Sequence, residues 1–371
     1  MAKTAFFWDE RCFWHSGSNY ASVAPVGGLV QPLAAGGLPE SPETKRRLKS
    51  LMDVTGLIKA LDCPATDAAS EEDLRRIHPA SYLNTFKNMS DAGGGELGER
   101  TPFGPGSYEI AALSAGLVKG ALFQVLNGDA SNAYALSRPP GHHCLPDTPM
   151  GFCLMANIAV AIEAALAEKA GQRFAVIDWD VHHGNGTEAI FIERSDVLTI
   201  SLHQESNYPW ATGAASVRGD GAGEGFNVNV PLLPGSGHDA YLYAFDRVVA
   251  PALRDYKPDA IIVACGFDAS GLDPLSRMLA SADTFRAMTE RTLALADELC
   301  GGRLVMAHEG GYSEVHVPFC GHAVIQALAG ASIEAPDPFA ARFRAQQANE
   351  RFQALQRELI DEFVELFGFA S

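Results

Sequence analysis

Residues 174–187 read "FAVIDWDVHHGNGT", four apolar residues followed at once by two aspartates, two histidines and two glycines. Such a run, ending in ionisable and turn-forming residues, predicts a buried strand that opens into a loop. Asp178 and Asp180 are two positions apart, so on an extended chain their side chains face the same way, and His182 continues the spacing. The stretch therefore predicts a cluster of ionisable groups at the carboxyl end of a strand.

Similar apolar runs recur between segments of helical composition. The strand-like runs lie at 132–137, 174–180, 197–203, 260–268 and 303–311. The helical segments lie at 154–170, 239–254, 283–300 and 340–367. Continuously apolar strands are typical of a parallel sheet covered on both faces, and the alternation indicates a doubly wound α/β fold. Since polar clusters follow the strands, we expect them to meet at the carboxyl edge of the sheet.

The chain shows no internal repeat, low-complexity segment or interdomain linker. We therefore expect one domain over residues 1–371, with a C-terminal helix at about 338–368 packed on it or on another subunit. Hydrophobic residues make up 47% of the chain, enough for a large core.

Charge and cysteine content narrow the possible partners and compartment. The net charge is −17 and no basic patch is visible, which argues against nucleic acid as a partner. No uninterrupted apolar run reaches the roughly 18 residues that span a membrane. Seven scattered cysteines do not form a disulfide framework, so we expect a cytoplasmic protein. The acidic surface could attract a cationic substrate, although solubility alone is the favoured explanation.

Asp180, His182 and Asp268 form a candidate metal site. Two carboxylates and one imidazole, with no cysteine, leave an open position for water and substrate, as in catalytic rather than structural zinc sites. The oxygen-rich set also suits Fe(II), Mn(II) or Co(II). Any one of these residues alone would be read as an ordinary turn residue, and only the set argues for a metal.

Two further segments carry groups suited to proton transfer and oxyanion binding. The tandem histidines His142 and His143 follow a Pro-Pro-Gly run, which can aim both rings at a cleft. Histidine exchanges protons near neutral pH. Tyr312 follows two glycines, and its phenol could donate a hydrogen bond to a developing oxyanion. Taken singly, the histidine pair and the tyrosine could equally be structural.

The chain resembles the histone deacetylase family over roughly residues 5 to 330. The resemblance rests on "RPPGHH" (138–143), "GFC" (151–153), "DWDVHHGNGT" (178–187), "SLH" (201–203), "GFDASGLDPL" (266–275) and "EGGY" (309–312), in the family's order. The nearest likeness is to the bacterial histone deacetylase-like amidohydrolases, which are allied to class II. The resemblance implies the arginase/deacetylase α/β fold, with an eight-stranded parallel sheet in one domain and the active site at the carboxyl ends of the strands.

The resemblance also implies roles for the candidate residues. It makes Asp180, His182 and Asp268 the ligands of one catalytic zinc ion. It makes Tyr312 the donor to the amide oxygen.

The histidine pair is assigned in the same way. His143 would be the general base that activates the zinc-bound water and then protonates the leaving amine, and His142 its electrostatic partner. Asp178 would orient His142, and Asn185 would orient His143. Asn185 is the class II form of a position that is often Asp.

One or two structural potassium ions are implied by the resemblance alone. The first site would use Asp178, Asp180, His182, Ser201 and Leu202, largely through backbone oxygens. The second would use the carbonyls of Phe191, Arg194, Val197 and Phe226.

A narrow aromatic tunnel would fit the apolar stem of an acyl-lysine. The expected substrate-binding residues are Gly151, Phe152, Tyr208, Leu275 and Gly310. Tyr208 stands where relatives usually have Phe. Leu275 stands where some polyamine-selective members carry a Glu that reads a cationic amine, so a dedicated polyamine enzyme is less favoured.

The leading hypothesis is a zinc-dependent amidohydrolase that removes acetyl or related acyl groups from lysine-type amines in peptides, proteins or small molecules. An acetylpolyamine amidohydrolase is the alternative among enzymes, and a non-catalytic acyl-lysine binding module the alternative outside them. A ureohydrolase of the arginase type ranks low, because its two-metal cluster needs more ligands. We also expect a homo-oligomer (dimer or tetramer), a structural role for His183, and a solvated loop position for His308.

Overall fold

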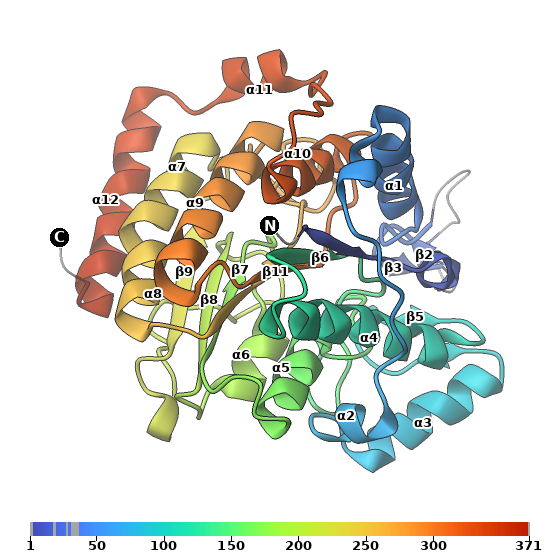
Figure 1. Ribbon diagram of the computed structural model, residues 1–371. Helices are drawn as coiled ribbons and strands as arrows, with labels where there is room; N and C mark the ends of the chain where they lie inside the picture. The colour runs from blue at the N-terminus through green and yellow to red at the C-terminus, as the bar shows by residue number, and fades with distance from the viewer. Residues whose placement is uncertain (1–2, 18–19, 27–28, 31–36, 370–371) are drawn as a thin grey trace.

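A seven-stranded, wholly parallel sheet forms the centre of the computed structural model, which describes residues 3–17, 20–26, 29–30 and 37–369 (Figure 1). The strand order is β1-β6-β11-β10-β7-β8-β9. The strands are β1 (Ala5–Phe7), β6 (Asn132–Ala135), β7 (Phe174–Asp178), β8 (Val197–Gln204), β9 (Asn227–Leu232), β10 (Ala260–Cys265) and β11 (Leu304–His308). The α/β class and the five predicted strands are confirmed, whereas β1 and β9 were not predicted.

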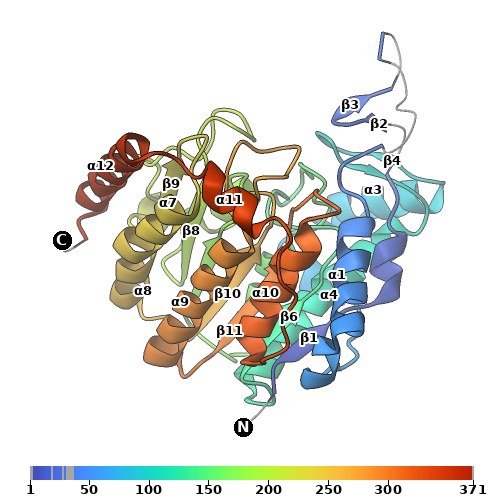
Figure 2. The ribbon, with the colours of Figure 1, turned by 90° about the horizontal axis from the view of Figure 1, so that it is seen from above.

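Helices cover both faces of this sheet (Figures 1 and 2). One layer holds α4 (Ser107–Leu126), α5 (Asn157–Ala167) and α6 (Asn185–Phe191). The other holds α1 (Glu43–Thr55), α7 (His238–Ala244), η4 (Phe245–Val249), α8 (Ala250–Tyr256), α9 (Ala282–Cys300), α10 (Val317–Ala329) and α12 (Glu350–Phe367). Smaller elements are η1 (Glu10–Trp14), β2 (Tyr20–Ala21), β3 (Ala24–Pro25), η2 (Leu57–Ala60), α2 (Glu71–Arg75), α3 (Ala80–Asp91), β4 (Gly95–Glu96), β5 (Pro102–Phe103), η3 (Gly221–Gly223) and α11 (Ala340–Gln346).

Successive residues of the central strands enter two separate cores. In β10, Ile261 and Val263 join the core beneath the α9 layer, while Ile262 and Ala264 join the core beneath the α4 layer. This follows from the two-residue repeat of a strand, and it explains why the strands are apolar throughout rather than alternating.

The expected eighth strand is absent from the described residues. Its place beside β1 is taken by a single bridge, in which Asp62 N donates to Thr4 O (3.0 Å) and Phe6 N donates to Asp62 O (2.7 Å). Pro64 follows two residues later and has no N–H to continue the pairing. The prediction of eight strands was therefore wrong for this part of the chain.

The C-terminal helical segment differs from expectation. The predicted helix at about 338–368 is two helices, α11 and α12, because the chain turns at Gln347 and the side chain of Asn349 caps α12 by accepting from Phe352 N (3.1 Å).

Helix α4 is long and apolar enough, by length and composition, to cross a membrane, although 61% of its most apolar window is buried. It packs against β1, β6 and β11, and so serves this fold as a core helix.

Candidate active site

The three predicted metal ligands meet at the carboxyl ends of β7 and β10. Nδ1 of His182 lies 3.0 Å from Oδ1 of Asp180 and 3.0 Å from Oδ2 of Asp268. All three side chains are buried, and one ligand atom from each lies within 4.8 Å of the others. The structure therefore brings together residues that are up to 88 positions apart in the sequence (180 to 268).

The charges and the space at this point fit a divalent cation. Burial, reinforced by the neighbouring Asp180 carboxylate, raises the pKa of Asp268 to about 6, and a cation between the two carboxylates would favour their charged forms. Gly310 leaves the necessary room: a Cβ there would lie 2.3 Å from Asp268 Oδ2 and 2.6 Å from Asp180 Oδ2. Its N–H also donates to Asp180 Oδ2 (2.8 Å). The donor set matches an open, catalytic-type metal site.

The tandem histidines are buried beside this group, each with a different partner. Nδ1 of His142 lies 2.9 Å from Oδ2 of Asp178, and Nδ1 of His143 lies 2.7 Å from Oδ1 of Asn185. The two imidazole rings are 3.9 Å apart between centroids. Asp178 ends β7 and Asn185 begins α6, so one strand–loop–helix segment fixes both rings.

The two environments set the histidines apart in basicity. Burial opposes charge on His142, but the carboxylates of Asp180 and Asp178 raise its pKa well above the ordinary value. Burial lowers the pKa of His143, and the positive charge of the neighbouring His142 lowers it further. A neutral His143 beside a charged His142 is an arrangement suited to one base and one electrostatic partner.

Tyr312 stands at the wall of a cavity of about 350 Å³ that reaches His143 and His182. Its backbone N–H donates to Oδ2 of the buried Asp273 (2.8 Å), whose other oxygen accepts from Leu275 N (2.9 Å). Asp273 thus fixes both the tyrosine arm and the rim of the cavity. No role was predicted for Asp273 from the sequence, although it stands directly before Pro274 in the "GFDASGLDPL" motif.

The predicted tunnel residues Gly151, Phe152, Tyr208 and Leu275 all line this cavity, but Gly310 instead backs the metal ligands. The ring of Phe152 meets that of Tyr312 edge to face at 5.7 Å between centroids, and Tyr208 meets His143 at 5.1 Å. A Cβ on Gly151 would lie 2.4 Å from Cδ2 of His143, so only glycine lets the tunnel wall approach the histidine this closely.

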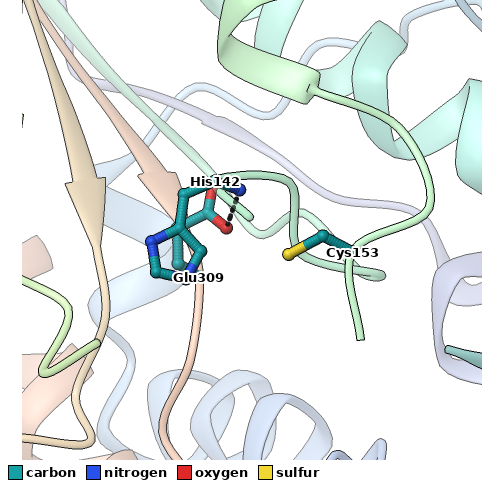
Figure 3. Close-up of side chains that lie close together, drawn as sticks. All are labelled: His142, Cys153 and Glu309. Carbon is teal, nitrogen blue, oxygen red and sulfur yellow. Dashed lines mark hydrogen bonds between the residues drawn. The ribbon is translucent and has the colours of Figure 1, made fainter. Parts of the chain in front are cut away.

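Glu309 is a second residue that the sequence analysis missed. It is fully buried beside His142 and Cys153 (Figure 3). Its Oε2 accepts from the backbone N–H groups of Gly141 (2.7 Å) and His142 (3.1 Å), while Cys153 Sγ accepts from His143 N (3.4 Å). Burial raises the pKa of Glu309 to about 7. The "EGGY" segment therefore contributes a carboxylate that holds the histidine loop, besides the tyrosine.

His183 and His308, two further histidines of the conspicuous motifs, are not among the residues that line the cavity. His183 bonds to Thr212 Oγ1 (3.0 Å) and Glu188 Oε2 (3.2 Å), contacts that tie a loop to α6. The prediction of a solvated His308 was wrong: it ends β11, is fully buried, and its Nδ1 lies 2.7 Å from the hydroxyl of Tyr134. Its partner comes from a neighbouring strand 174 residues away, which the local sequence could not reveal.

The residues suggested for potassium lie close to these elements. Ser201 pairs with Asp178 across β7 and β8, and its hydroxyl lies 3.0 Å from His203 Nδ1. In the second set, Phe191 O accepts from Arg194 N (2.9 Å), and Phe226 O accepts from Thr199 N (3.0 Å). The assignment of either set to an ion stays a prediction.

Comparisons with known proteins place the chain in a family. The model of the histone deacetylase domain matches residues 38–328. A histone deacetylase-like amidohydrolase of Pseudomonas aeruginosa is 57% identical over 366 residues, 99% of this chain and 96% of that protein. A probable deacetylase of Archaeoglobus fulgidus is 36% identical over 303 residues, 80% of this chain and 84% of that protein.

A solved structure agrees with these matches. The crystal structure of the HDA15 HD domain superposes with a TM-score of 0.81 at 30% identity, covering 100% of this chain and 99% of that one. The fold and the site define a parallel α/β protein with a buried Asp-His-Asp group of the kind that can hold a metal ion. The chain belongs to the histone deacetylase family.

Proposed function

We propose that this protein is a zinc-dependent amidohydrolase that removes acetyl or related acyl groups from lysine-type amines. The observation that carries the proposal is the buried Asp180–His182–Asp268 group at the base of an aromatic cavity, next to two histidines and a tyrosine. The similarity to the amidohydrolase of Pseudomonas aeruginosa supports the same reaction class.

Asp180, His182 and Asp268 would hold the ion. When bound, zinc supplies Lewis acidity toward the substrate carbonyl and lowers the pKa of water. Iron(II) and cobalt(II) suit the same ligands, and we propose zinc because the open Asp-His-Asp set is of the catalytic zinc type.

The chain's own side chains divide the proton and charge work. His143, kept neutral by burial, takes the proton of the attacking water and delivers it to the leaving amine nitrogen. Asn185 holds its ring through Nδ1, leaving Nε2 for the exchange. The Tyr312 hydroxyl, whose pKa burial raises well above the ordinary value, stays protonated and donates to the amide oxygen as negative charge develops.

Phe152 and Tyr208 exclude water around the stem of the acylated side chain. Among the alternatives, a non-catalytic acyl-lysine binder would not need the base and the phenol that this site retains. An acetylpolyamine substrate is less favoured, because Leu275 offers no charge for a cationic amine.

The proposal extends to features that rest on the family resemblance. One or two potassium ions would bind at the two sets of backbone oxygens around Ser201 and Val197. The protein would act in the cytoplasm as a dimer or tetramer, with acylated peptides, proteins or small amines as substrates.

Turnover of an acetyl-lysine amide, a trifluoroacetyl-lysine amide and N-acetylated polyamines, measured side by side, tests the proposal. We expect the lysine amides to be hydrolysed, and a chelator or a hydroxamate to abolish the activity. Binding of all three without hydrolysis would favour the binding-module alternative, and preferential hydrolysis of the polyamines would favour the other enzyme.

A further inference from the structure

We infer that the mouth of the cavity selects acylated lysines that have a carboxylate nearby, so that acidic peptides are the preferred substrates. The inference rests on the proposed function and adds the substrate class. It arises from the charges at the cavity mouth, which are opposite in sign to the charge of the whole protein.

Two arginines, Arg100 and Arg277, line the cavity. Among the lining residues that the structure describes, there is no lysine, aspartate or glutamate. Val23 brings an N-terminal segment to the same wall, and that segment carries no Lys, Arg, Asp or Glu from residue 16 to residue 39. Residues outside the described ranges in this segment therefore cannot supply a carboxylate to the mouth.

Arg277 is the clearer of the two cations. It is exposed, and no described carboxylate lies within ion-pair distance of its guanidinium, whose Nη1 donates to the carbonyl of its neighbour Ser276 (2.6 Å). Its backbone is fixed, because Arg277 N donates to Gln204 Oε1 (2.7 Å) and Arg277 O accepts from Gly235 N (2.6 Å). The guanidinium thus stands at a defined place on the rim with donors left for a ligand.

Arg100 lies over the aromatic wall. Its Cζ is 4.9 Å from the centroid of the Tyr208 ring, a cation–π contact that holds the charge beside the tunnel. Glu99 is 3.8 Å from Nε of Arg100 and 56% exposed, so it partly offsets this charge without lining the cavity. The uncompensated positive charge at the mouth therefore comes from Arg277, while Glu99 offsets the charge of Arg100.

This local charge opposes the field of a protein whose net charge is −17. At physiological ionic strength, interactions between exposed charges fade beyond about 8 Å, so the rim arginines decide what a substrate meets at the entrance. A carboxylate beside the acylated lysine would meet these arginines, whereas a cationic amine would be repelled. The same charges disfavour polyamine substrates independently of Leu275.

Four acetyl-lysine peptides, three that differ in the residues flanking the lysine and one that differs in its C-terminus, test the inference. The lysine is flanked on both sides by glycine, aspartate or lysine in peptides with blocked ends. The fourth is the glycine peptide with a free C-terminal carboxylate, which separates a side-chain carboxylate from a terminal one. The readout is kcat/KM relative to the blocked glycine peptide, at low and high salt.

We expect the aspartate peptide to exceed the glycine peptide by about two- to fivefold, the range of an exposed charge pair, and the lysine peptide to fall below it. High salt should shrink both differences. In Arg277→Gln the aspartate-to-glycine ratio should move toward one, with a smaller change in Arg100→Gln. Arg254→Gln, which removes the same charge at the end of α8 and before β10, should keep the wild-type ratio.

A ratio at or below one in the wild type overturns the inference, and so does a ratio that both rim variants leave unchanged. A gain for the free C-terminal carboxylate alone would assign the recognition to the chain terminus rather than to acidic side chains. Lack of turnover of the blocked glycine peptide would contradict the proposed function instead, so the two failures are distinguishable.

Discussion

Oδ1 of Asn185 lies 2.7 Å from Nδ1 of His143, so the histidine proposed as the base is oriented by a neutral amide. A neutral partner stabilises the imidazolium less than a carboxylate would, and leaves the pKa of His143 low. The contact also holds the base against the first residue of α6, a helix that directly follows the metal-binding loop.

Replacing Asn185 with aspartate tests this orientation. The added carboxylate should raise the pKa of His143, and the base must be neutral to accept a proton. We therefore expect the acidic limb of the kcat/KM profile to move to higher pH in Asn185→Asp. An acidic limb at the wild-type position would show that His143 does not control it.

Removing the phenol of Tyr312 should affect the chemical step alone. Loss of one oxyanion donor typically lowers kcat by about 100- to 1000-fold. We expect Tyr312→Phe to show a drop of this order for an acetyl-lysine amide, with the bound metal per chain unchanged. Turnover like that of the wild type would exclude Tyr312 as the donor.

The room left by Gly310 predicts a metal-binding defect. In Gly310→Ala the new Cβ would collide with carboxylate oxygens of Asp268 and Asp180 at 2.3 and 2.6 Å. Metal affinity, measured by competition with a chromogenic chelator, should fall while the far-ultraviolet circular dichroism stays unchanged. An unchanged metal affinity would show that binding of the ion does not depend on the present positions of the Asp180 and Asp268 carboxylates.

The buried carboxylate of Glu40 predicts how stability depends on pH. Burial would raise its pKa, but Arg138 (2.9 Å) and Lys45 (3.0 Å) lower it from 4.5 to about 2. A lowered pKa stabilises the fold fully above about pH 4.5, and this stabilisation is lost as the pH falls toward 2. Glu40→Gln should cost about 3–5 kcal/mol at neutral pH, since it leaves two buried cations unpaired.

Thermal unfolding at a series of pH values checks this prediction. The difference in Tm between wild type and Glu40→Gln should be largest at neutral pH and should shrink below pH 4.5. A difference that stays constant down to pH 2.5 would contradict the assigned pKa.

Much of the site could be predicted because its residues lie in short segments directly after apolar strands. The parallel sheet then brings the ends of β7 and β10 together, so the spacing in "DWDVHH" and the acid in "GFDASG" sufficed for the metal group. Residues that act through backbone contacts were harder to find. Glu309 and Asp273 accept hydrogen bonds from amide groups of distant loops, and the place of an acid in a motif does not show which amide it will meet.

The errors in the fold have similar causes. Strand β1 spans three residues, which is too short to show a periodicity. Beside it, where an eighth strand was expected, the chain forms only the isolated bridge between Ala5 and Asp62, which no sequence pattern reveals. His308 was expected in a solvated loop, whereas it ends β11 and its partner Tyr134 reaches it from the neighbouring strand β6.

We propose that Asp180, His182 and Asp268 hold one ion on which hydrolysis depends. The most direct test titrates chelator-stripped protein with Zn²⁺ and follows bound metal and turnover of an acetyl-lysine amide in the same samples. We expect activity to rise in step with occupancy and to saturate at about one ion per chain, and we expect Asp180→Ala neither to bind the ion tightly nor to hydrolyse the amide. Full activity in the metal-free protein, or one tightly bound ion in Asp180→Ala, would contradict it.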